Sequence, residues 1–595
     1  MNDPLRRALM RAEPGSDRFL RFEDPEASRI ATSPAEVPAL LDFAERGAAR
    51  GLWAVGFVGY EGAPAFDPAL VAHPPASGPA PLAAFALFRG PTEQRLAPAS
   101  GAGSPQPTTD VRAGLETESF VAAVERIREA IAAGSTYQVN LSFPFYGRFS
   151  SSSETEESLI AAFLAPGEAP YAAWLEGASW AILSLSPELF LERDGGRVVS
   201  KPMKGTRPRG RFPAEDERRA VELARSEKDR AENLMIVDMI RNDLGRLARP
   251  GSVGVERALE VERYPTVWQM TSTVAATTDA RLPELFAALF PCASVTGAPK
   301  PATTRFIREL EPAPRGVYCG AIGFVEPGGR ARFSVAIRTL EIDRRDATFR
   351  YGVGCGVTWD SDAREEWREC LAKARVLEGP PPDFDLIETM RWREGAGVER
   401  LDLHLERIVA SAGHFGFEAA AAGAAELASR LRAEIATHGG ALPAGSHRLR
   451  LRLARGGEIR VESKPFEPET RVWTVAVTSD SSSSEDVFAF HKTTNRERYE
   501  RALASAAPGV DEVLLINEHG ELTEGTRTNL MVQMGGEVWL TPPIESGLLP
   551  GVYREHLLRT GEAVEATLYP RDLKRAHRIR LVNSLRGWIP AKLSS

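Results

Sequence analysis

Hydrophobic and polar positions along the chain follow two periods, one typical of helices and one typical of strands. Residues 119–135 carry apolar side chains at the spacing of one helix face, at Phe120, Val124, Ile127 and Ile131. Residues 137–149 instead alternate in the manner of a strand. Strand-like and helix-like runs continue to mix up to about residue 375. This pattern predicts a fold of the α/β or α+β class.

The clearest break in the pattern is LEGPPPDF, residues 377–384, because three consecutive prolines cannot continue the helix expected before them. A second α/β unit of roughly 210 residues follows, a length that suits one domain. We therefore predict a multidomain protein. The expected boundaries are a first domain over 1–376, with an N-terminal subregion (1–110) and a catalytic part (115–376), a linker over 377–383, and a second domain over 384–595.

Composition predicts irregular structure in two stretches of the chain. Residues 74–110 are rich in Pro, Ala, Gly and Ser, which indicates a loop or an insertion. The serine run at residues 479–487 is typical of a flexible loop.

Length, charge and cysteine usage exclude several classes of protein. The 595 residues exceed what one hydrophobic core serves, and the net charge of −8 argues against a nucleic-acid binder. The sequence contains no run of about 18 apolar residues, so we predict no membrane span. The N-terminus lacks the apolar stretch of a secretory signal. Four scattered cysteines without zinc spacing are expected to be free thiols, as in a cytoplasmic protein.

Lys204 and Glu188 form the first candidate pair. The stretch from residue 183 to residue 210 has the pattern of strand, turn, strand and glycine-containing loop, with Glu188 at the turn and Lys204 at the end of the second strand. A hairpin would bring both side chains into one cleft. A partly desolvated Lys becomes a nucleophile, and a nearby Glu then serves as general acid and base. The alternative for Lys204 is an ordinary solvated cation.

Three further carboxylates lie on helix-like runs. Glu366 and Glu369 are three positions apart and therefore share one helix face, and Glu232 lies on a mostly apolar helix. Carboxylates from two helices are suitable ligands for Mg²⁺. The alternative for Glu369 is a surface pair with Lys373, one helical turn later.

The second domain contains the residue types that a pyridoxal phosphate (PLP) enzyme needs. Lys492 precedes a helix-like run, Glu524 follows a strand and a turn, and a Gly-Val pair at 551–552 begins a helix whose free N–H groups suit a phosphate. A lysine for the Schiff base, a carboxylate for the pyridine nitrogen and a phosphate anchor together indicate PLP. Each residue alone also has an ordinary structural explanation.

Seven motifs in the first domain occur in the order found in chorismate-utilising enzymes: SPELF, PMKGT, AENLMIVDMIRNDLGR, SVTGAPK, RGVYCGAIGF, VAIRTL and EEWRECLAKA. Residues 115–375 therefore resemble this family, which includes aminodeoxychorismate synthase component I, anthranilate synthase and isochorismate synthase. The resemblance implies a sandwich-like core of two β-sheets with surrounding helices. The resemblance implies that Lys204 in the PMKGT motif favours the aminodeoxychorismate synthases over the anthranilate synthases, which carry Ala there. Isochorismate-type enzymes also carry Lys in this loop, as a base for water, so Lys204 argues less strongly against them.

The same resemblance implies a role for individual side chains. It implies that Lys204 attacks C2 of chorismate and that Glu188 protonates the departing C4 hydroxyl, after which ammonia adds at C4. Gln269 stands where many relatives have a His beside the leaving group. The remaining implied contacts are Mg²⁺ ligands at Glu232, Glu366 and Glu369, and substrate contacts at Arg338, Gly297, Gly354 and Lys373.

Residues 383–590 resemble the fold-type IV PLP family through HLERI, HKTTNR, ELTEGTRTNL and LLPGVYRE. This family includes branched-chain and D-amino-acid aminotransferases and 4-amino-4-deoxychorismate lyase. The resemblance implies that Lys492 forms the Schiff base and transfers protons, and that Thr389 takes part in the proton relay. The implied cofactor contacts are Glu524, Arg407, Asn529, Gly551 and Val552.

The two resemblances together imply synthesis of 4-aminobenzoate, a folate precursor, from chorismate by way of 4-amino-4-deoxychorismate. None of the four cysteines lies in a glutaminase-like loop, so we expect a separate glutamine amidotransferase subunit or free ammonia as the nitrogen source. A homodimer through the second domain is expected by analogy. Two alternatives stay open: an isochorismate- or anthranilate-type enzyme joined to an aminotransferase, and a non-catalytic protein that binds an aromatic ligand.

Overall fold

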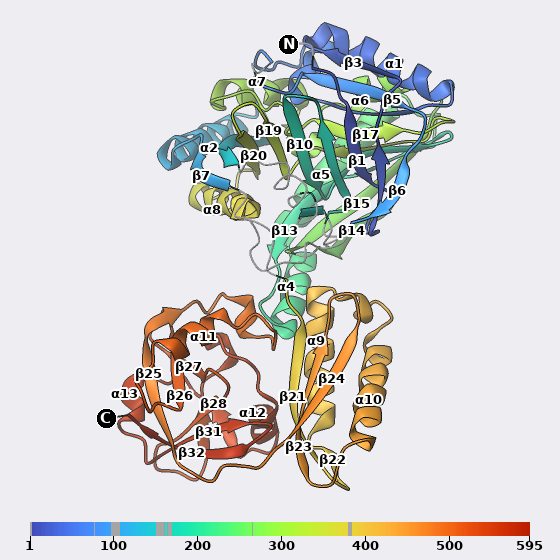
Figure 1. Ribbon diagram of the computed structural model, residues 1–595. Coiled ribbons are helices and arrows are strands. Elements are labelled where there is room, and N and C mark those ends of the chain that lie inside the picture. The colour runs from blue at the N-terminus through green and yellow to red at the C-terminus, as the bar shows by residue number, and fades with distance from the viewer. Residues whose placement is uncertain are drawn as a thin grey trace. The chain divides into compact units, whose positions relative to one another are not determined.

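The computed structural model describes residues 3–75, 78–96, 108–149, 160, 163–164, 169–264, 266–378 and 383–594. Contacts divide the chain into two compact units (Figure 1). The first unit consists of Met1–Pro208 and Ala220–Pro381, and the second consists of Arg209–Arg219 and Pro382–Ser595. Most of the expected linker, residues 379–382, lies outside the described residues. The short segment Arg209–Arg219 belongs to the second unit, which the sequence did not indicate.

Two large antiparallel sheets form the first unit. One has the order β16 (Gly297–Ala298), β8 (Gln138–Phe149), β20 (Thr348–Val357), β19 (Thr339–Asp343), β10 (Trp180–Ser186), β9 (Tyr171–Glu176), β1 (Arg7–Arg11), β2 (Arg18–Phe22) and β6 (Thr92–Arg95), with β7 (Thr108–Ala113) beside β8. The other has the order β13 (Met203–Pro208), β15 (Val267–Thr277), β12 (Arg197–Lys201), β11 (Leu189–Asp194), β18 (Ala331–Val335), β17 (Ala321–Val325), β4 (Trp53–Val58), β5 (Ala83–Phe88) and β3 (Ala27–Ala31), with β14 (Gly254–Arg263) beside β15.

One apolar core lies between these two sheets. Leu175 and Ile182 from the first sheet pack in one cluster with Val55, Phe57 and Phe324 from the second. Within β4, Val55 and Phe57 are two positions apart and so point to the same face, as the strand period requires. The two-sheet core that the family resemblance implied is therefore confirmed.

Helices cover the outer faces of the first unit. They are α1 (Val37–Ala49), α2 (Thr117–Ala132), α5 (Glu227–Gly245), α6 (Leu282–Leu289), α7 (Lys300–Leu310) and α8 (Ala363–Ala374), with short 3₁₀ turns η1 (Pro34–Glu36), η2 (Tyr60–Ala65), η3 (Ala293–Val295) and η4 (Arg375–Glu378). The predicted helix around residues 119–135 is α2, which buries Phe120, Val124 and Ile127.

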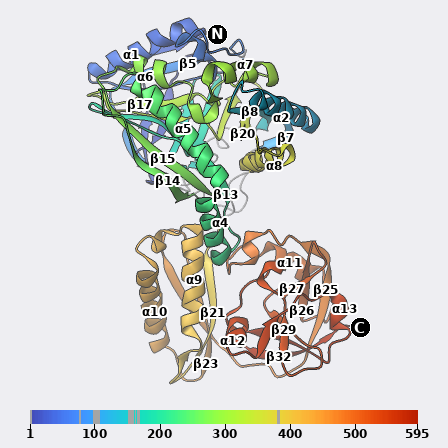
Figure 2. The same ribbon diagram turned by 180° about the vertical axis from the view of Figure 1, so that it is seen from behind.

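Helix α5 is the element that approaches the candidate site. It crosses the face of the sheet at β13 and β15 (Figure 2). The Ser226 side chain caps its first turn by accepting a hydrogen bond from the Asp229 N–H. Ile236 and Ile240 are buried one turn apart, and Glu232 lies one turn before them on the same face.

The second unit contains two further sheets. A four-stranded sheet has the order β22 (Gly397–Val398), β21 (Leu386–Arg393), β23 (Ser446–Leu453) and β24 (Ile459–Pro465), covered by α9 (Leu401–Phe415) and α10 (Ala424–Gly440). A mixed eight-stranded sheet has the order β27 (Leu522–Gly525), β26 (Glu512–Asn517), β25 (Trp473–Ser482), β32 (Gly587–Leu593), β31 (Arg578–Asn583), β28 (Asn529–Gln533), β29 (Trp539–Thr541) and β30 (Ala563–Glu565). Also present are α11 (Glu497–Ala504), α12 (Val552–Arg559), α13 (Pro570–Leu573), η5 (Glu418–Ala420), η6 (Val487–Ala489) and η7 (Ile544–Ser546).

Both stretches predicted as loops contain regular structure. The prediction for residues 74–110 was wrong where β5 and β6 lie, since the six residues of β5 are all buried between two partner strands. Residues 76–77 and 97–107 of that stretch lie outside the described part of the chain. The serine run begins inside β25, where Ser481 and Ser482 pair with Ile516 and Asn517 of β26. In both places, pairing with strands from elsewhere in the chain decided the local structure, and local composition did not.

The structure also bears on the expectations about membrane spans and cysteines. Among the described residues, no helix is long and apolar enough to cross a membrane. The four cysteines are free and buried.

Candidate functional sites

The first site forms where β10 turns into β11, close to β13. Glu188 lies in that turn, and only 2% of it is exposed. Its Oε1 accepts a 2.6 Å hydrogen bond from Ser294 Oγ. Burial raises the pKa of Glu188 to about 7, although the Ser294 hydrogen bond and the charge of Lys204 oppose that shift. A carboxyl group with this pKa is suited to proton transfer near neutral pH.

Lys204 lies on β13, and its side chain is directed toward Gly356 of β20. A Cβ atom placed on Gly356 would lie 2.8 Å from Lys204 Nζ. The Lys204 charge also acts on Glu188, Glu232 and Glu369. The structure therefore brings together a lysine, a buried acid and further carboxylates that are far apart in the sequence.

Gln138 is a member of this site that the sequence analysis missed. It is fully buried on β8, and neither its Nε2 nor its Oε1 has a hydrogen-bond partner among the described residues. A Cβ atom on Gly356 would lie 2.4 Å from Gln138 Nε2, so this amide lies beside Lys204. A buried amide without a partner is costly unless a ligand satisfies it. The only sequence signal was a polar residue in the strand YQVNLSF.

Gln269 supports the backbone around Lys204. Its Nε2 donates a 2.8 Å hydrogen bond to the carbonyl of Gly205, and its Oε1 accepts one of 2.9 Å from Thr206 Oγ1. Asn233 of α5 adds a longer bond of 3.4 Å to the carbonyl of Lys204 itself. Both amide atoms of Gln269 thus bond to the residues that follow Lys204, rather than being reserved for a leaving group.

Among the three candidate metal ligands, Glu366 lies within electrostatic range of both Glu232 and Glu369. The pKa of Glu232 is raised, first by burial and also by the charge of Glu366, while Lys204 opposes the shift. The pKa of Glu366 is raised by burial and then by Glu369, and its Oε1 accepts a 2.8 Å bond from Ser361. A divalent cation would relieve this repulsion between carboxylates.

Glu369 pairs with Lys373 at 2.7 Å, which matches the alternative interpretation given above. The charge of Lys373 holds the pKa of Glu369 below its ordinary value. Within the described ranges, no group of three or more His, Cys, Asp or Glu side chains is arranged to hold a metal ion. Mg²⁺ commonly takes one or two protein carboxylates and completes its shell with water and substrate oxygens, so Glu232 and Glu366 still fit it.

The predicted substrate contacts lie on β16 (Gly297), on β20 (Gly354), on α8 (Lys373) and directly before β19 (Arg338). A side chain at Gly297 would meet the carbonyl of Gln138, and one at Gly354 would meet Ser142 Oγ, so both positions need glycine. Lys373 Nζ donates a 2.8 Å bond to the carbonyl of Gly354. Arg338 has a left-handed backbone with φ of 50°, a strained conformation that is frequent at functional sites.

The second site surrounds Lys492, which follows η6 in the second unit. Burial is the main cause that lowers the pKa of Lys492 to about 8, and the positive charge of Arg407 adds to the effect. Glu524 on β27 is 4% exposed, and its Oε1 accepts bonds from Tyr499 Oη at 2.6 Å and from Arg498 at 3.0 Å. A lysine of lowered pKa suits the Schiff base with PLP, and a buried carboxylate within its electrostatic range suits the pyridine nitrogen.

The phosphate contacts predicted from the sequence gather at the start of α12. Gly551 is the N-cap residue and Val552 the first residue of this helix. A Cβ atom on Gly551 would clash with Asn529 Oδ1, so this position requires glycine. Asn529 Nδ2 donates to the carbonyl of Leu549, and Arg407 Nη1 donates to that of Pro550. These contacts make a helix N-terminus suited to an anion.

Arg407 is held by Glu388, a partner that the sequence analysis missed. Arg407 Nε and Nη2 donate to the two oxygens of Glu388 at 2.8 and 2.7 Å. His404 Nδ1 lies 2.6 Å from Glu388 Oε2, and His404 Nε2 lies 2.7 Å from Ser584 Oγ. Although burial opposes it, these charges lower the pKa of Glu388 to about 2. Thr389, the expected relay residue, follows Glu388 on β21 and is partly buried.

Comparisons with known proteins identify both parts of the chain. Residues 13–379 match the model of chorismate binding enzymes, and residues 385–593 match the model of class IV amino-transferases. An aminodeoxychorismate synthase of Streptomyces griseus is 43% identical over 268 residues, which is 44% of this chain and 36% of that protein. This chain thus spans little more than a third of that relative's length.

Two further relatives are anthranilate synthases. Component 1 from Streptomyces coelicolor is 36% identical over 404 residues, which is 59% of this chain and 75% of that protein. The crystal structure of component I from Streptococcus pneumoniae matches with a TM-score of 0.50 and 25% identity over 57% of this chain and 85% of that one. Overall similarity therefore does not separate the two activities.

Proposed function

The chain belongs to the chorismate-binding enzyme family and carries a class IV amino-transferase domain, and on this premise we propose that it makes 4-aminobenzoate from chorismate. The first unit would form 4-amino-4-deoxychorismate, and the second would split it into 4-aminobenzoate and pyruvate. The observation that carries this proposal is Lys204, directed at Gly356 next to a buried Glu188 with a pKa of about 7.

In the first reaction, the amine of Lys204 would form a bond to C2 of chorismate while the ring double bonds shift and the C4–O bond breaks. Glu188, protonated near neutral pH, would give its proton to the departing hydroxyl, which leaves as water. Ammonia would then bond to C4, and the bond between Lys204 and C2 would break as the double bonds return. Arg338, Lys373 and the glycine backbone would orient the substrate carboxylates.

Mg²⁺ would be held by Glu232 and Glu366, with Glu369 close by. When bound, such an ion neutralises carboxylate charge and orients the substrate. Burial raises the pKa of both Glu232 and Glu366, and neighbouring carboxylates add to each shift. A bound cation would offset both effects, which supports this assignment.

The class IV domain implies PLP, which withdraws electrons from the carbon that bears the substrate amine. Lys492 would hold the cofactor, remove the ring proton at that carbon and deliver a proton to the departing three-carbon group. Glu524 would keep the pyridine nitrogen protonated. Arg407, with Asn529 and the N–H groups at 551–552, would hold the phosphate, and Thr389 would assist proton transfer.

The nitrogen for the first reaction would come from a separate glutamine amidotransferase subunit or from free ammonia. The four cysteines are buried, so none is available as an exposed glutaminase nucleophile. Release of ammonia from glutamine by the pure chain would contradict this part. We also propose a homodimer through the second unit, which sedimentation analysis would test.

Product analysis tests the whole proposal. The pure protein is incubated with chorismate, Mg²⁺, an ammonium salt and PLP, alongside Lys204→Ala and Lys492→Ala. We expect 4-aminobenzoate from wild type, accumulated aminodeoxychorismate from Lys492→Ala, and loss of the first step in Lys204→Ala. Anthranilate from wild type, the product that the Streptomyces coelicolor relative suggests, would instead assign the first unit to that reaction.

A further inference from the structure

The segment Arg209–Arg219 comes from within the sequence of the first unit but makes its contacts in the second. It begins five positions after Lys204 and includes the first half of α4 (Pro213–Arg225). Phe212 is 5% exposed and packs on Phe490, with ring centroids 5.3 Å apart. Phe212, Ala489 and Phe490 form one apolar cluster. Phe490 lies two positions before Lys492 in the sequence.

Charged groups fix the conformation of this segment. Arg209 makes a bidentate pair with Asp216, with bonds of 2.7 and 2.6 Å. Glu215 Oε2 accepts bonds from both the backbone N–H and the Nε of Arg211, at 2.7 and 3.0 Å. These bonds hold the residues of the segment to one another, in addition to its contacts with the rest of the unit.

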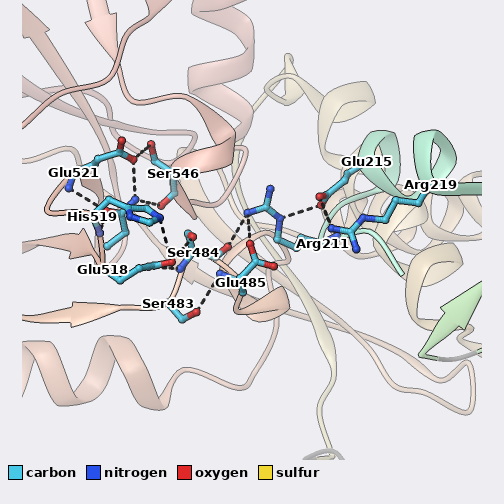
Figure 3. A network of polar contacts seen from close by, with 11 residues as sticks. Arg211, Glu215, Arg219, Ser483, Ser484, Glu485, Glu518, His519, Glu521 and Ser546 are labelled. Atoms are coloured by element: carbon cyan, nitrogen blue, oxygen red, sulfur yellow. Dashed lines mark hydrogen bonds and ion pairs between the residues drawn. The ribbon is translucent and has the colours of Figure 1, made fainter. Parts of the chain in front are cut away.

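Arg211 then connects the segment to the loop before η6 (Figure 3). Its Nη1 donates to the carbonyl of Ser484 at 3.1 Å and to Glu485 Oε1 at 3.2 Å. Ser484 is itself held by Glu518, through its N–H at 2.8 Å and its Oγ at 2.6 Å. Glu518 lies in the turn before β27, the strand that carries Glu524.

His491, the neighbour of Lys492, is held by the same segment. Its Nε2 lies 3.1 Å from the carbonyl oxygen of Arg211, and its Nδ1 lies 2.9 Å from Ser411 Oγ. A carbonyl oxygen only accepts, so Nε2 carries the proton and Nδ1 accepts from the Ser411 hydroxyl in the neutral ring. Burial is the main cause that lowers the pKa of His491, and the groups facing the ring are His414, Arg209 and Asp216.

We propose that residues 209–219 are a positioning element of the PLP site, in which the Arg211 carbonyl fixes the tautomer and orientation of His491 and thereby the backbone of Lys492. The Lys492 carbonyl is also bonded to the Ile387 N–H at 2.9 Å. The lysine is thus constrained on one side by β21 and on the other by His491. This inference rests on the proposed assignment of PLP to Lys492.

The test compares full-length variants by the visible absorbance of bound PLP and its change with pH. Phe212→Ala and Arg211→Ala keep the Arg211 carbonyl but remove side-chain contacts that hold the segment in place. With the carbonyl displaced from His491 Nε2, PLP binding should weaken roughly tenfold, the scale of one lost hydrogen bond. The pH midpoint of the absorbance change should rise by about half a pH unit or more. A less tightly packed site admits water, and water stabilises the protonated form of the nitrogen that joins Lys492 to PLP. The groups that face Lys492 and stay in place are Arg407, Glu388, Arg496 and Glu524.

Matched variants separate positioning from general damage. Glu217→Ala changes an exposed residue of the same helix and should leave both readouts at wild-type values. His491→Gln keeps a donor toward the Arg211 carbonyl and should stay near wild type, whereas His491→Leu should show the shift even if Phe212→Ala fails to fold.

Two outcomes would count against different claims. Absorbance and PLP affinity unchanged in folded Phe212→Ala, Arg211→Ala and His491→Leu would overturn the positioning role alone. Absence of a PLP absorbance band in the wild-type protein would overturn the cofactor assignment on which it rests.

Discussion

Ser294 Oγ donates a 2.6 Å hydrogen bond to Glu188 Oε1, and this bond moderates the pKa of the buried carboxyl. Burial raises that pKa to about 7, so Glu188 loses its proton as the pH rises through neutrality. Chorismate consumption should therefore fall on the alkaline side with a midpoint near 7. Ser294→Ala removes an opposing contribution and should move the midpoint to higher pH.

The measurement is the pH profile of kcat for chorismate consumption with ammonium salt, corrected for the ammonia fraction. Glu188→Gln serves as the reference and should lower kcat by roughly 10²- to 10⁴-fold. An alkaline midpoint that Ser294→Ala leaves in place would show that Glu188 is not the acid.

Gly356 is the position where a single methyl group should act most selectively on the first reaction. An added Cβ would lie 2.4 Å from Gln138 Nε2 and 2.8 Å from Lys204 Nζ, so both side chains must move. Gly356→Ala should reduce kcat for chorismate consumption by about 10²-fold or more, the scale of a misplacement near 1 Å.

Gly254→Ala is the matched control, since an added Cβ there meets nothing within 4 Å. PLP absorbance should be the same in both variants. Gly356→Ala with wild-type kcat would mean that Lys204 acts from a different position.

The free amine of Lys492 should be available at unusually low pH. Its pKa is lowered to about 8, chiefly by burial, against about 10.4 for an ordinary lysine. Cofactor capture needs the deprotonated amine, so the rate at which the PLP-free protein recovers its absorbance should rise with pH and level off above about 8. A rate that keeps rising to pH 10 would contradict the assignment.

Arg315 and Glu311 form a buried ion pair in the first unit. Each side chain is 2% exposed, and Arg315 also donates to the carbonyls of Val295 and Asn140 at 2.7 and 2.6 Å. Arg315→Met should lower the free energy of unfolding by about 3–5 kcal/mol, because it leaves a buried carboxylate without its partner.

The comparison is Arg249→Met, which breaks an exposed pair with Asp279 and should cost at most about 1 kcal/mol. Urea unfolding of the full-length protein, followed by circular dichroism, measures both variants. Equal effects would show that the Arg315 pair contributes no more than a surface contact.

The sequence motifs singled out side chains that the structure brings together at two places. Lys204 and Glu188 do lie at one place, and Lys492, Glu524 and Arg407 at another, as their electrostatic contacts indicate. The sandwich core followed in the same way from a family resemblance.

The sequence could not predict partners that come together only in three dimensions. Gln138 is one polar residue in an alternating strand, and its position beside Lys204 depends on the pairing of β8 with β20. Glu388 is likewise one residue of β21, and its contacts with Arg407 and His404 depend on how α9 packs on that strand. Composition also misjudged β5, whose burial depends on neighbouring strands from elsewhere in the chain.

The position of Arg209–Arg219 has a consequence for protein engineering. The proline run at 380–382 looks like a natural place to separate the chain into two independent enzymes. A fragment that starts there would lack Phe212 and the Arg211 carbonyl, exposing Phe490 and leaving His491 Nε2 without its acceptor. The two catalytic parts are thus interleaved, and recombining either with a homologous partner would require the exchange of a short internal segment as well as a terminal domain.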